Sequence, residues 1–564
     1  MKYTNILLKT LKESPSDENS RNAELLIRGG FINKEMAGVY SYLPLGLKVL
    51  RKIENIVREE MEAIGSSEIL MPALSPKANW EKTARWNEVD VLFKLELSGN
   101  REIALNPTHE EVVTPLVQTF ANSPKDFPKC VFQIQNKFRN EPRAKSGLLR
   151  GREFLMKDAY SFHTSQEDFE KYYDMMTQAY HKVYKRLGIG DITKFVAADG
   201  GAFSEFSHEF QTISPIGEDE LFYRKSNDTY LNKEITPCVA ERWNNTDEAV
   251  ADMEDALGKG IIGVNELAKF LNIPVEKTTK TMLFETEEGK VIAAAVRGNR
   301  EIDTRKLTKL VGCKSLELAS EETVKRVTGA PVGYAGVLNL PAEVQVLWDE
   351  SCQDRVNFEM GANKEDYHTI NINFGRDIEK PEHFYDIKIA QDGDSCPETG
   401  EKYEIFRAIE VGNIFPLSTK FSKSFKFNSE GKDIIMGCYG IGISRTMGAL
   451  AEIFADEKGL VWPENIAPAH IYLAPIGKND DVYEKAEALY NELQAKGIEV
   501  LYDNRRDKKT GPGTKFGDHE LLGIPYRVVL SERLLEANEA EIVSRKTGET
   551  KNISLDAIIS EFTK

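Results

Sequence analysis

The sequence FRNE at residues 138–141, followed by a polar loop and by RGREFLMKD at residues 150–158, decides the fold of this chain. Strand-forming residues flank the loop, in the runs 130–136 and 153–159. Two strands joined by a short polar loop are typical of an antiparallel pair. We therefore expect an antiparallel sheet here, with the loop at one end of the pair.

The same two stretches carry side chains suited to a phosphorylated ligand. Arg139 stands at the end of the first strand, and Arg150 and Arg152 stand just before the second. Guanidinium groups suit phosphate oxygens, and the ring of Phe154 can lie against a purine. Taken alone, Arg139 and Glu141 could be a surface ion pair. Together, the stretches predict a bound nucleotide.

A second informative stretch is MGCYGIGISR at residues 436–445, which predicts a strand leading into a helix. Glycines let a ligand approach the backbone of such a strand closely. Arg445 adds a cation at the start of the helix. By itself the G-x-G at 440–442 could be a packing turn, but its occurrence together with the first stretch favours one shared site.

Length and composition limit the number of domains and the classes of protein that this chain can belong to. The 564 residues correspond to three or four domains of roughly 150 residues each, and 41% apolar residues are typical of a folded protein. No apolar run reaches the roughly 18 residues of a membrane helix, so we expect no membrane contact and a cytoplasmic location. The net charge of −17 argues against bulk attraction to nucleic acid. Six scattered cysteines without a C-x-x-C pair predict reduced thiols and no structural zinc.

The pattern of predicted elements divides the chain into four segments. Residues 1–222 hold the first nucleotide-binding stretch and two amphipathic helices. Residues 223–406 differ in composition and separate two blocks that share a site, so they are expected to form an inserted domain. Residues 407–466 carry the second stretch. Residues 467–564 alternate strand and helix, which predicts a sheet with parallel pairs.

These stretches resemble the signatures of the bacterial-type prolyl-tRNA synthetases, which belong to class II of the aminoacyl-tRNA synthetases. Residues 138–158 match the second class signature, the run ending in Arg445 matches the third, and the helix before Pro72 matches the first. The runs PTHEE from 107, SHEF from 207 and EVG from 410 look like prolyl-specific sequences. The resemblance spans nearly the whole chain. It implies a multidomain α+β protein: a catalytic core on an antiparallel sheet, an inserted α+β editing domain and a C-terminal α/β anticodon-binding domain.

The resemblance also implies a reaction. The family joins proline to ATP, with Mg²⁺, as an aminoacyl adenylate and then transfers the acyl group to tRNA(Pro). Arg139 would hold the α-phosphate and the amino-acid carboxylate, and Arg150 or Arg152 the γ-phosphate, while Phe154 and Arg445 would enclose the adenine. A homodimer is expected because the first signature forms the family's subunit interface. The implied set for ATP and Mg²⁺ is Arg139, Glu141, Arg150, Arg152, Phe154 and Arg445, with Glu410 as the Mg²⁺ ligand.

The amino-acid pocket implied by the resemblance contains Thr108 and Glu110, whose hydroxyl and carboxylate would receive the secondary ammonium of proline. Ser207 and His208 are expected as walls, although His208 could equally be a structural histidine. Some nearby positions depart from the family's pattern: Ser204, Glu205, Phe206, Asn413, Pro416 and Ser418. They leave open a synthetase for another small amino acid. A non-catalytic RNA-binding paralogue is the second alternative.

The inserted segment resembles the family's editing domain. A pocket for proline excludes the smaller alanine only weakly, since a missing methylene is worth about 1 to 3 kcal/mol, so a second site must hydrolyse alanyl-tRNA(Pro). The matching positions are Lys280, Gly329, Asp349 and His368. Taken singly, these residue types are more typical of structural roles: Lys280 as a helix-surface charge, Asp349 as a turn residue and His368 as a strand residue.

A local basic run lies between Asp503 and Lys515 in the C-terminal segment. By itself such a run is more typical of a solvated loop. The segment resembles the family's anticodon-binding domain, however, and unpaired anticodon bases can be read on their edges. Arg505 and Lys515 are therefore expected to contact tRNA.

Overall fold

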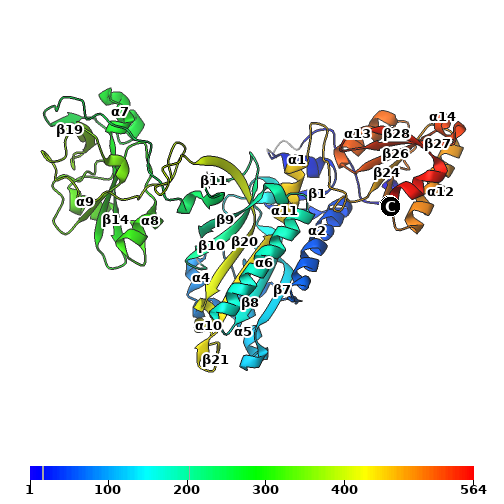
Figure 1. Ribbon diagram of the computed structural model, residues 1–564, viewed down its shortest axis with the longest axis horizontal. Coiled ribbons are helices and arrows are strands. Elements are labelled where there is room, and N and C mark those ends of the chain that lie inside the picture. The colour runs from blue at the N-terminus through cyan, green and yellow to red at the C-terminus, as the bar shows by residue number, and fades with distance from the viewer. Residues whose placement is uncertain (15–17, 19, 202, 564) are drawn as a thin grey trace. The chain divides into compact units, whose positions relative to one another are not determined.

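The computed structural model describes residues 1–14, 18, 20–201 and 203–563. Contacts within the chain divide it into two compact units (Figure 1). The first comprises Met1–Phe195, Gly200–Gly217 and Ala408–Lys564, and the second comprises Val196–Asp199 and Glu218–Arg407. The long segment of the second unit thus begins at Glu218, a few residues before the expected position 223. Among the described helices, none is long and apolar enough to cross a membrane.

Six strands of the first unit pair in the order β10-β20-β23-β8-β7-β3. All neighbours are antiparallel except β3 and β7, which are parallel. The predicted antiparallel pair is confirmed, because β7 and β8 pair from Lys129↔Phe162 to Phe138↔Glu153. The bounds are β3 (Ser67–Glu68), β7 (Lys129–Phe138), β8 (Glu153–His163), β10 (Phe206–Ile213), β20 (Glu404–Ser418) and β23 (Ile435–Gly442).

The two faces of this sheet are covered by different helices. Helices α2 (Pro44–Ala63), α6 (Gln166–Arg186) and α11 (Ile443–Ile453) share one hydrophobic core with Ala159 of β8. Tyr160 and Phe162 pack instead with α5 (Glu110–Phe120) and α10 (Lys420–Ser424). Because successive strand side chains point to opposite faces, α5 and α6 lie on opposite sides of the sheet. The helical patterns expected at α2 and α6 are confirmed.

The run from Glu68 to Leu74, expected as one edge strand, is two short strands instead. β3 pairs with the edge of the sheet at Ser67–Glu68, and β4 (Leu74–Pro76) pairs with β6 (Arg101–Leu105). Pro72 lies between them. Its fixed φ and missing N–H interrupt a strand ladder, so the edge position was predicted correctly and the continuity was not.

The C-terminal part of the first unit has its own sheet, in the order β25-β24-β26-β27-β28. β24 (Ile471–Ile476) is parallel to both β25 (Val500–Tyr502) and β26 (Tyr526–Ser531), which confirms the expected parallel pairs. β27 (Glu539–Ser544) and β28 (Thr550–Ser554) are antiparallel additions. The helices of this part include α12 (Asp480–Ala495) and α13 (Pro512–Leu522).

The second unit is a mixed α+β structure. One sheet has the order β16-β14-β15-β17 and another the order β13-β19-β18. The helices are α7 (Val264–Leu271), α8 (Thr304–Val311) and α9 (Glu321–Thr328). The strand bounds are β13 (Glu254–Leu257), β14 (Thr279–Thr286), β15 (Val291–Arg297), β16 (Leu316–Leu318), β17 (Gln345–Trp348), β18 (Phe358–Gly361) and β19 (Tyr367–Ile372). Lys280 therefore lies on a strand, not on the helix surface expected for its structural role.

Candidate functional site

The two arginine-bearing stretches meet on the face of the sheet that α5 covers. Arg139 follows β7, and its guanidinium carbon lies 5.1 Å from the ring centre of Phe154 on β8. Burial lowers the pKa of Arg139, and the positive charge of Arg445 lowers it further, while Glu410 opposes the shift. The guanidinium groups of Arg139 and Arg445 are thus close enough to repel each other. This arrangement has the positive charge that a polyphosphate requires.

Arg445 is held in place from two other segments. Its Nε donates to the carbonyl of Leu149 at 2.8 Å, and its Nη1 donates to Oε2 of Glu410 at 2.9 Å. The other carboxylate oxygen of Glu410 accepts from Asn413 at 3.2 Å. The cation stacked on Phe154 in this structure is Arg139, whereas the resemblance implied that Phe154 and Arg445 enclose a purine. One face of Phe154 is therefore already used by Arg139.

Arg150 and Arg152, the two candidates for binding the γ-phosphate, make different contacts in the loop between β7 and β8. Arg152 donates through Nε to the carbonyl of Glu141 at 3.0 Å and through Nη1 to the carbonyl of Ala37 at 2.9 Å. Arg150 instead pairs with the Glu141 carboxylate at 2.9 Å, and its side chain is 41% exposed. Because Arg152 is committed to backbone carbonyls, the geometry favours Arg150 as the group that reaches a phosphate.

Thr108 and Glu110 converge at the first turn of α5. Oγ1 of Thr108 donates to Oε2 of Glu110 at 2.6 Å, and the thiol of Cys438 on β23 lies 3.1 Å from Oε1. Glu110 is fully buried, and a helix N-terminus favours a carboxylate. A buried carboxylate with an oriented hydroxyl beside it is suited to receive a cationic amine.

Several buried polar residues next to this pair were not predicted from the sequence. Lys137 on β7 lies 2.5 Å from Asp158 on β8 and 2.9 Å from Nδ1 of His109. Burial and the charge of Lys137 lower the pKa of His109 to about 4, so this histidine is neutral at pH 7. Arg85 lies against Glu110 and Glu111. The two-residue spacing between Lys137, on β7, and Arg139, just after it, was a usable signal, since residues two apart share a strand face.

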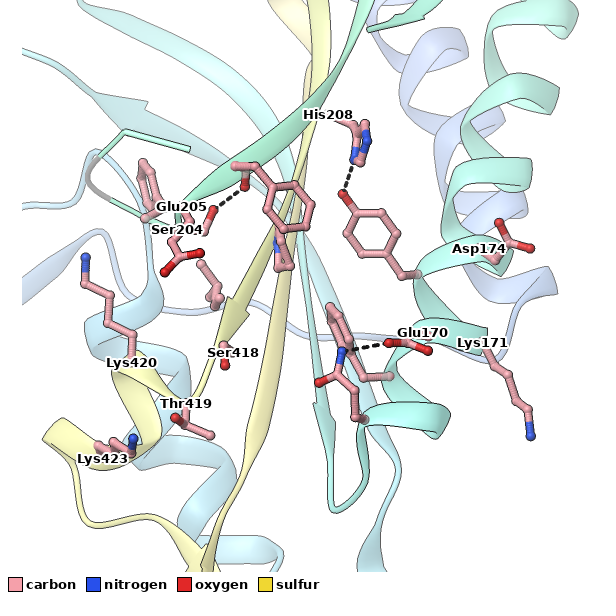
Figure 2. A pocket seen from close by; sticks show the side chains of 17 residues that line it. Glu170, Lys171, Asp174, Ser204, Glu205, His208, Ser418, Thr419, Lys420 and Lys423 are labelled. Atoms are coloured by element: carbon pink, nitrogen blue, oxygen red, sulfur yellow. Dashed lines mark hydrogen bonds between the residues drawn. The ribbon is translucent and has the colours of Figure 1, made fainter. Parts of the chain in front are cut away.

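Ser207 and His208 do not point the same way, because they are consecutive on β10. Nδ1 of His208 lies 2.8 Å from the hydroxyl of Tyr173 on α6 (Figure 2), and its ring stacks on Phe195 at 4.6 Å. Burial lowers the pKa of His208. His208 therefore lies on the α6 side of the sheet, away from Glu110. This corrects the expectation that it is a wall of the amino-acid pocket and favours the structural role.

A cavity of about 1130 Å³ opens beside His208, between α6, the start of β10, the end of β20 and α10 (Figure 2). Most positions that depart from the family's pattern lie here rather than at Glu110: Ser204, Glu205, Phe206, Pro416 and Ser418 line the cavity. Asn413 is the exception, since it bonds Glu410. Ala202, in the same run, lies outside the described residues. The Thr108–Glu110 pair is thus formed by residues that match the family's pattern.

In the second unit, His368 on β19 is buried and both ring nitrogens have partners. Nδ1 lies 3.0 Å from Oε1 of Glu359, and Nε2 lies 2.9 Å from the carbonyl of Ile261. Burial acts to lower the pKa of His368, but Glu359 outweighs it and the pKa is raised. The ring of Tyr334, which follows the Gly329–Gly333 turn, is 5.8 Å away. A histidine polarised by a buried carboxylate can act as a general acid or base once one ring nitrogen is free, which here requires Nε2 to leave the carbonyl of Ile261.

The other expected editing residues have separate contacts. Asp349 is buried and accepts from the backbone N–H groups of Ser351 at 2.9 Å and Ile387 at 3.0 Å, as expected for a turn residue. Lys280 pairs with Glu301. Gly329 ends α9 in a left-handed conformation, with φ +81°. The structure therefore brings the Gly329 turn towards His368 through Tyr334, while Asp349 is engaged in holding the backbone.

The two residues expected to contact tRNA are engaged within the C-terminal sheet domain. Lys515 is 1% exposed, and its ammonium donates to the carbonyls of Asp503 at 2.9 Å and Pro475 at 3.0 Å. Arg505 pairs with Asp503 and Asp518, each at 2.6 Å, and stacks on the ring of Tyr3. These contacts correct the expectation for Lys515 and Arg505. The exposed cations of the run are Arg506, Lys508 and Lys509.

Replacing Lys515 should therefore affect stability rather than RNA binding. We expect Lys515→Ala to lower the free energy of unfolding by about 3 kcal/mol, because two buried carbonyls lose their donor. Urea denaturation measures this loss. The exposed neighbour Lys508→Ala is the matched control, which should leave stability unchanged. Equal stability of the two variants would contradict the burial of Lys515.

The antiparallel sheet brings the arginines of two distant signatures together beside the buried Thr108–Glu110 pair, which is the arrangement expected of a class II aminoacyl-tRNA synthetase. Models of an aminoacyl-tRNA editing domain and an anticodon binding domain match residues 259–378 and 470–564. A curated proline–tRNA ligase from Bacillus cereus strain B4264 is 39% identical over 99% of this chain and 98% of its own length. One from Bacillus anthracis strain A0248 shows the same values. The chain belongs to the prolyl-tRNA synthetase family.

Solved structures give the same fold. Prolyl-tRNA synthetase from Cryptosporidium parvum, complexed with L-proline and AMP, superposes with a TM-score of 0.55 at 13% identity and covers 96% of this chain and 76% of that one. The Giardia lamblia enzyme in complex with prolyl-adenylate has a TM-score of 0.57 at 16% identity and covers 96% and 75%. At these identities the likeness concerns the fold. The expected class II architecture is confirmed.

Proposed function

We propose that this chain activates proline with ATP, transfers it to tRNA(Pro), and hydrolyses alanyl-tRNA(Pro) in its inserted domain. The observation that carries the first part is the convergence of Arg139 and Arg445 beside the buried Thr108–Glu110 pair. The pairing of a polyphosphate site with an amine site on one face of a sheet supports acyl-adenylate formation in a member of this family.

The reaction needs alignment and charge, not a side-chain nucleophile. The carboxylate oxygen of proline attacks the α-phosphorus of ATP, and the bond to pyrophosphate breaks. Arg139 would neutralise charge on the α-phosphate, and Glu110 would hold the ammonium. The terminal ribose hydroxyl of tRNA then attacks the acyl carbon, and AMP leaves. Arg150 would hold the outer phosphate.

Mg²⁺ enters this scheme with ATP. Mg²⁺ usually takes few ligands from the protein and keeps waters and substrate phosphates as the others. The single half-buried carboxylate of Glu410 fits this requirement. Glu410 would contribute one oxygen, and the ion would offset phosphate charge. Arg445 and Asn413 hold that carboxylate in position.

Amino-acid-dependent exchange of pyrophosphate into ATP, run with all twenty amino acids, tests the proposal. Exchange with proline above all others is the expected result. Exchange with another small amino acid would favour the first alternative, a synthetase for that amino acid. Absence of exchange with any amino acid would favour a non-catalytic RNA-binding paralogue.

The editing proposal rests on His368, Glu359 and the Gly329–Gly333 turn. We expect His368→Ala to slow deacylation of alanyl-tRNA(Pro) by about 100-fold, the usual contribution of a general acid–base group, without affecting proline-dependent exchange. His368→Gln is the conservative comparison, since its amide can replace one hydrogen bond to Glu359. Deacylation at the parent rate in both variants would contradict a catalytic role.

We also propose the domain assignment and the assembly. Residues 1–222 and 407–466 would form the catalytic core, 223–406 the editing domain and 467–564 the anticodon-binding domain, with Arg506, Lys508 and Lys509 as the exposed contacts for tRNA. A homodimer is supported by exposed apolar side chains on either side of Pro72 in the first signature: Leu70 at 75% and Leu74 at 47%. Exposed apolar side chains can mark an interface, and the molar mass in solution tests the assembly.

A further inference from the structure

Arg85 lies next to Glu110 of the Thr108–Glu110 pair, and its side chain is buried, with 2% exposed. It begins the short helix α4 (Arg85–Glu88). Its guanidinium carbon lies 4.7 Å from the ring centre of Phe203, 5.3 Å from that of Phe421 and 5.5 Å from that of Trp80. Three aromatic rings thus fix the position of one buried cation, because a guanidinium is attracted to ring faces.

The guanidinium contacts two carboxylates unequally. Its Nη1 lies 2.9 and 3.1 Å from the two oxygens of Glu111 but 3.5 Å from Oε2 of Glu110. Glu110 and Glu111 are both 0% exposed. The hydroxyl of Thr83 also donates to Glu111, at 2.9 Å. Arg85 is therefore primarily the partner of Glu111, and Glu110 keeps its own donors, Thr108 and Cys438.

The charges of Arg85, Glu110 and Glu111 add to one net negative charge when both carboxylates are ionised. Arg85 and Glu111 neutralise each other, which leaves the charge of Glu110. Two buried carboxylates side by side without a cation would share a proton. We propose that Arg85 and Glu111 are positioning residues: Glu111 engages Arg85, so the carboxylate of Glu110 stays free to pair with the secondary ammonium of the substrate. This inference rests on the function proposed above.

The proposal predicts how amino-acid affinity depends on pH. Burial, together with the charge of Glu110, raises the pKa of Glu111 to about 7 against the opposing effect of Arg85. Below that pH Glu111 is protonated, so Arg85 pairs with Glu110 and cancels its charge. Affinity for proline should therefore rise as pH increases through about 7. Among the described residues, the other charged or titratable groups that interact with the pair include Lys420, Lys137, Arg139, His109, Tyr160 and Cys438.

The test uses proline-dependent pyrophosphate exchange between pH 5.5 and 9, with KM measured separately for proline and ATP. Arg85→Leu should raise the proline KM by about 100-fold, the effect expected when one partner of a buried charge pair is removed. The ATP KM should change less than threefold, and Arg85→Lys should recover part of the loss. Glu111→Gln should raise the proline KM and remove its dependence on pH near 7.

Arg186→Leu is the matched control, since this arginine pairs with Glu59 and Glu60 at the surface and should leave both KM values unchanged. If Arg85→Leu fails to fold, Glu111→Gln decides, because it preserves shape. Equal rises in the proline and ATP KM, or a proline KM in Glu111→Gln that keeps the parent's pH dependence, would overturn the inference. Absence of proline-dependent exchange in the parent would instead overturn the proposed function.

Discussion

Arg139→Gln should reduce proline-dependent pyrophosphate exchange by about 1000-fold, the usual loss when a preorganised charge is removed from a developing oxyanion. Arg139 is the one described arginine whose charge interacts with Arg445, Glu410, Glu110 and Glu141 together. It therefore lies between the nucleotide side and the amine side of the site. The loss should fall mainly on kcat, because the charge is needed most while the α-phosphorus is being attacked.

Two observations make this effect separable from unfolding. Arg139 is only half-buried, and its main packing partner is the ring of Phe154. Arg143→Gln, in the exposed part of the same loop, is the matched control and should retain parental exchange and stability. A folded Arg139→Gln variant whose kcat remains within threefold of the parent would refute the role of this residue.

The elements that were predicted well are those whose signal is local. The stripe of apolar residues in α6 and the continuous apolar run of β24 depend on neighbours a few positions away, and both lie where they were expected. The hairpin of β7 and β8 also follows from adjacent residues. Periodicity reports which face of an element is buried, and that is enough to place Arg139, Phe154 and Arg445 on elements of known type.

The residues that were missed or misplaced depend on partners distant in sequence. Lys515 occurs in a basic run, yet its ammonium is buried and donates to the carbonyl of Pro475, 40 residues earlier, as well as to that of Asp503 at the start of the run. Arg85 is important only because the fold brings it to Glu110 and Glu111, 25 and 26 residues further on. Composition shows the sign of a charge, but only the tertiary fold shows which group it meets.

His208 was misplaced for a third reason, which is the phase of a strand. A run such as SHEF shows that its residues alternate between two faces, but a shift of one residue exchanges the faces. β10 has such a shift in its pairing with β20, between Phe210 and Gln211. The contact of His208 with Tyr173 fixes the phase and places His208 beside α6 (Figure 2).

Arg445→Ala should raise the KM for ATP by about 30-fold. This corresponds to losing a desolvated cation–π contact between Arg445 and the adenine ring, worth about 2 kcal/mol. The guanidinium is held by the Leu149 carbonyl and the Glu410 carboxylate, so its plane is set before a nucleotide arrives. The proline KM should change little, because the Thr108–Glu110 bond is made without Arg445. Steady-state exchange at varied ATP and at varied proline separates the two effects.

The fold should tolerate this change, because the side chains of Arg445 and Glu410 are each 31% exposed and water can solvate the carboxylate that is left. Arg445→Lys keeps the charge but loses the planar fork, so it should recover only part of the ATP affinity. We therefore expect the parent to bind ATP most tightly, Arg445→Lys less tightly and Arg445→Ala least tightly. Identical ATP kinetics in all three proteins would show that the second signature alone binds the nucleotide, and that the helix following β23 contributes no cation to it.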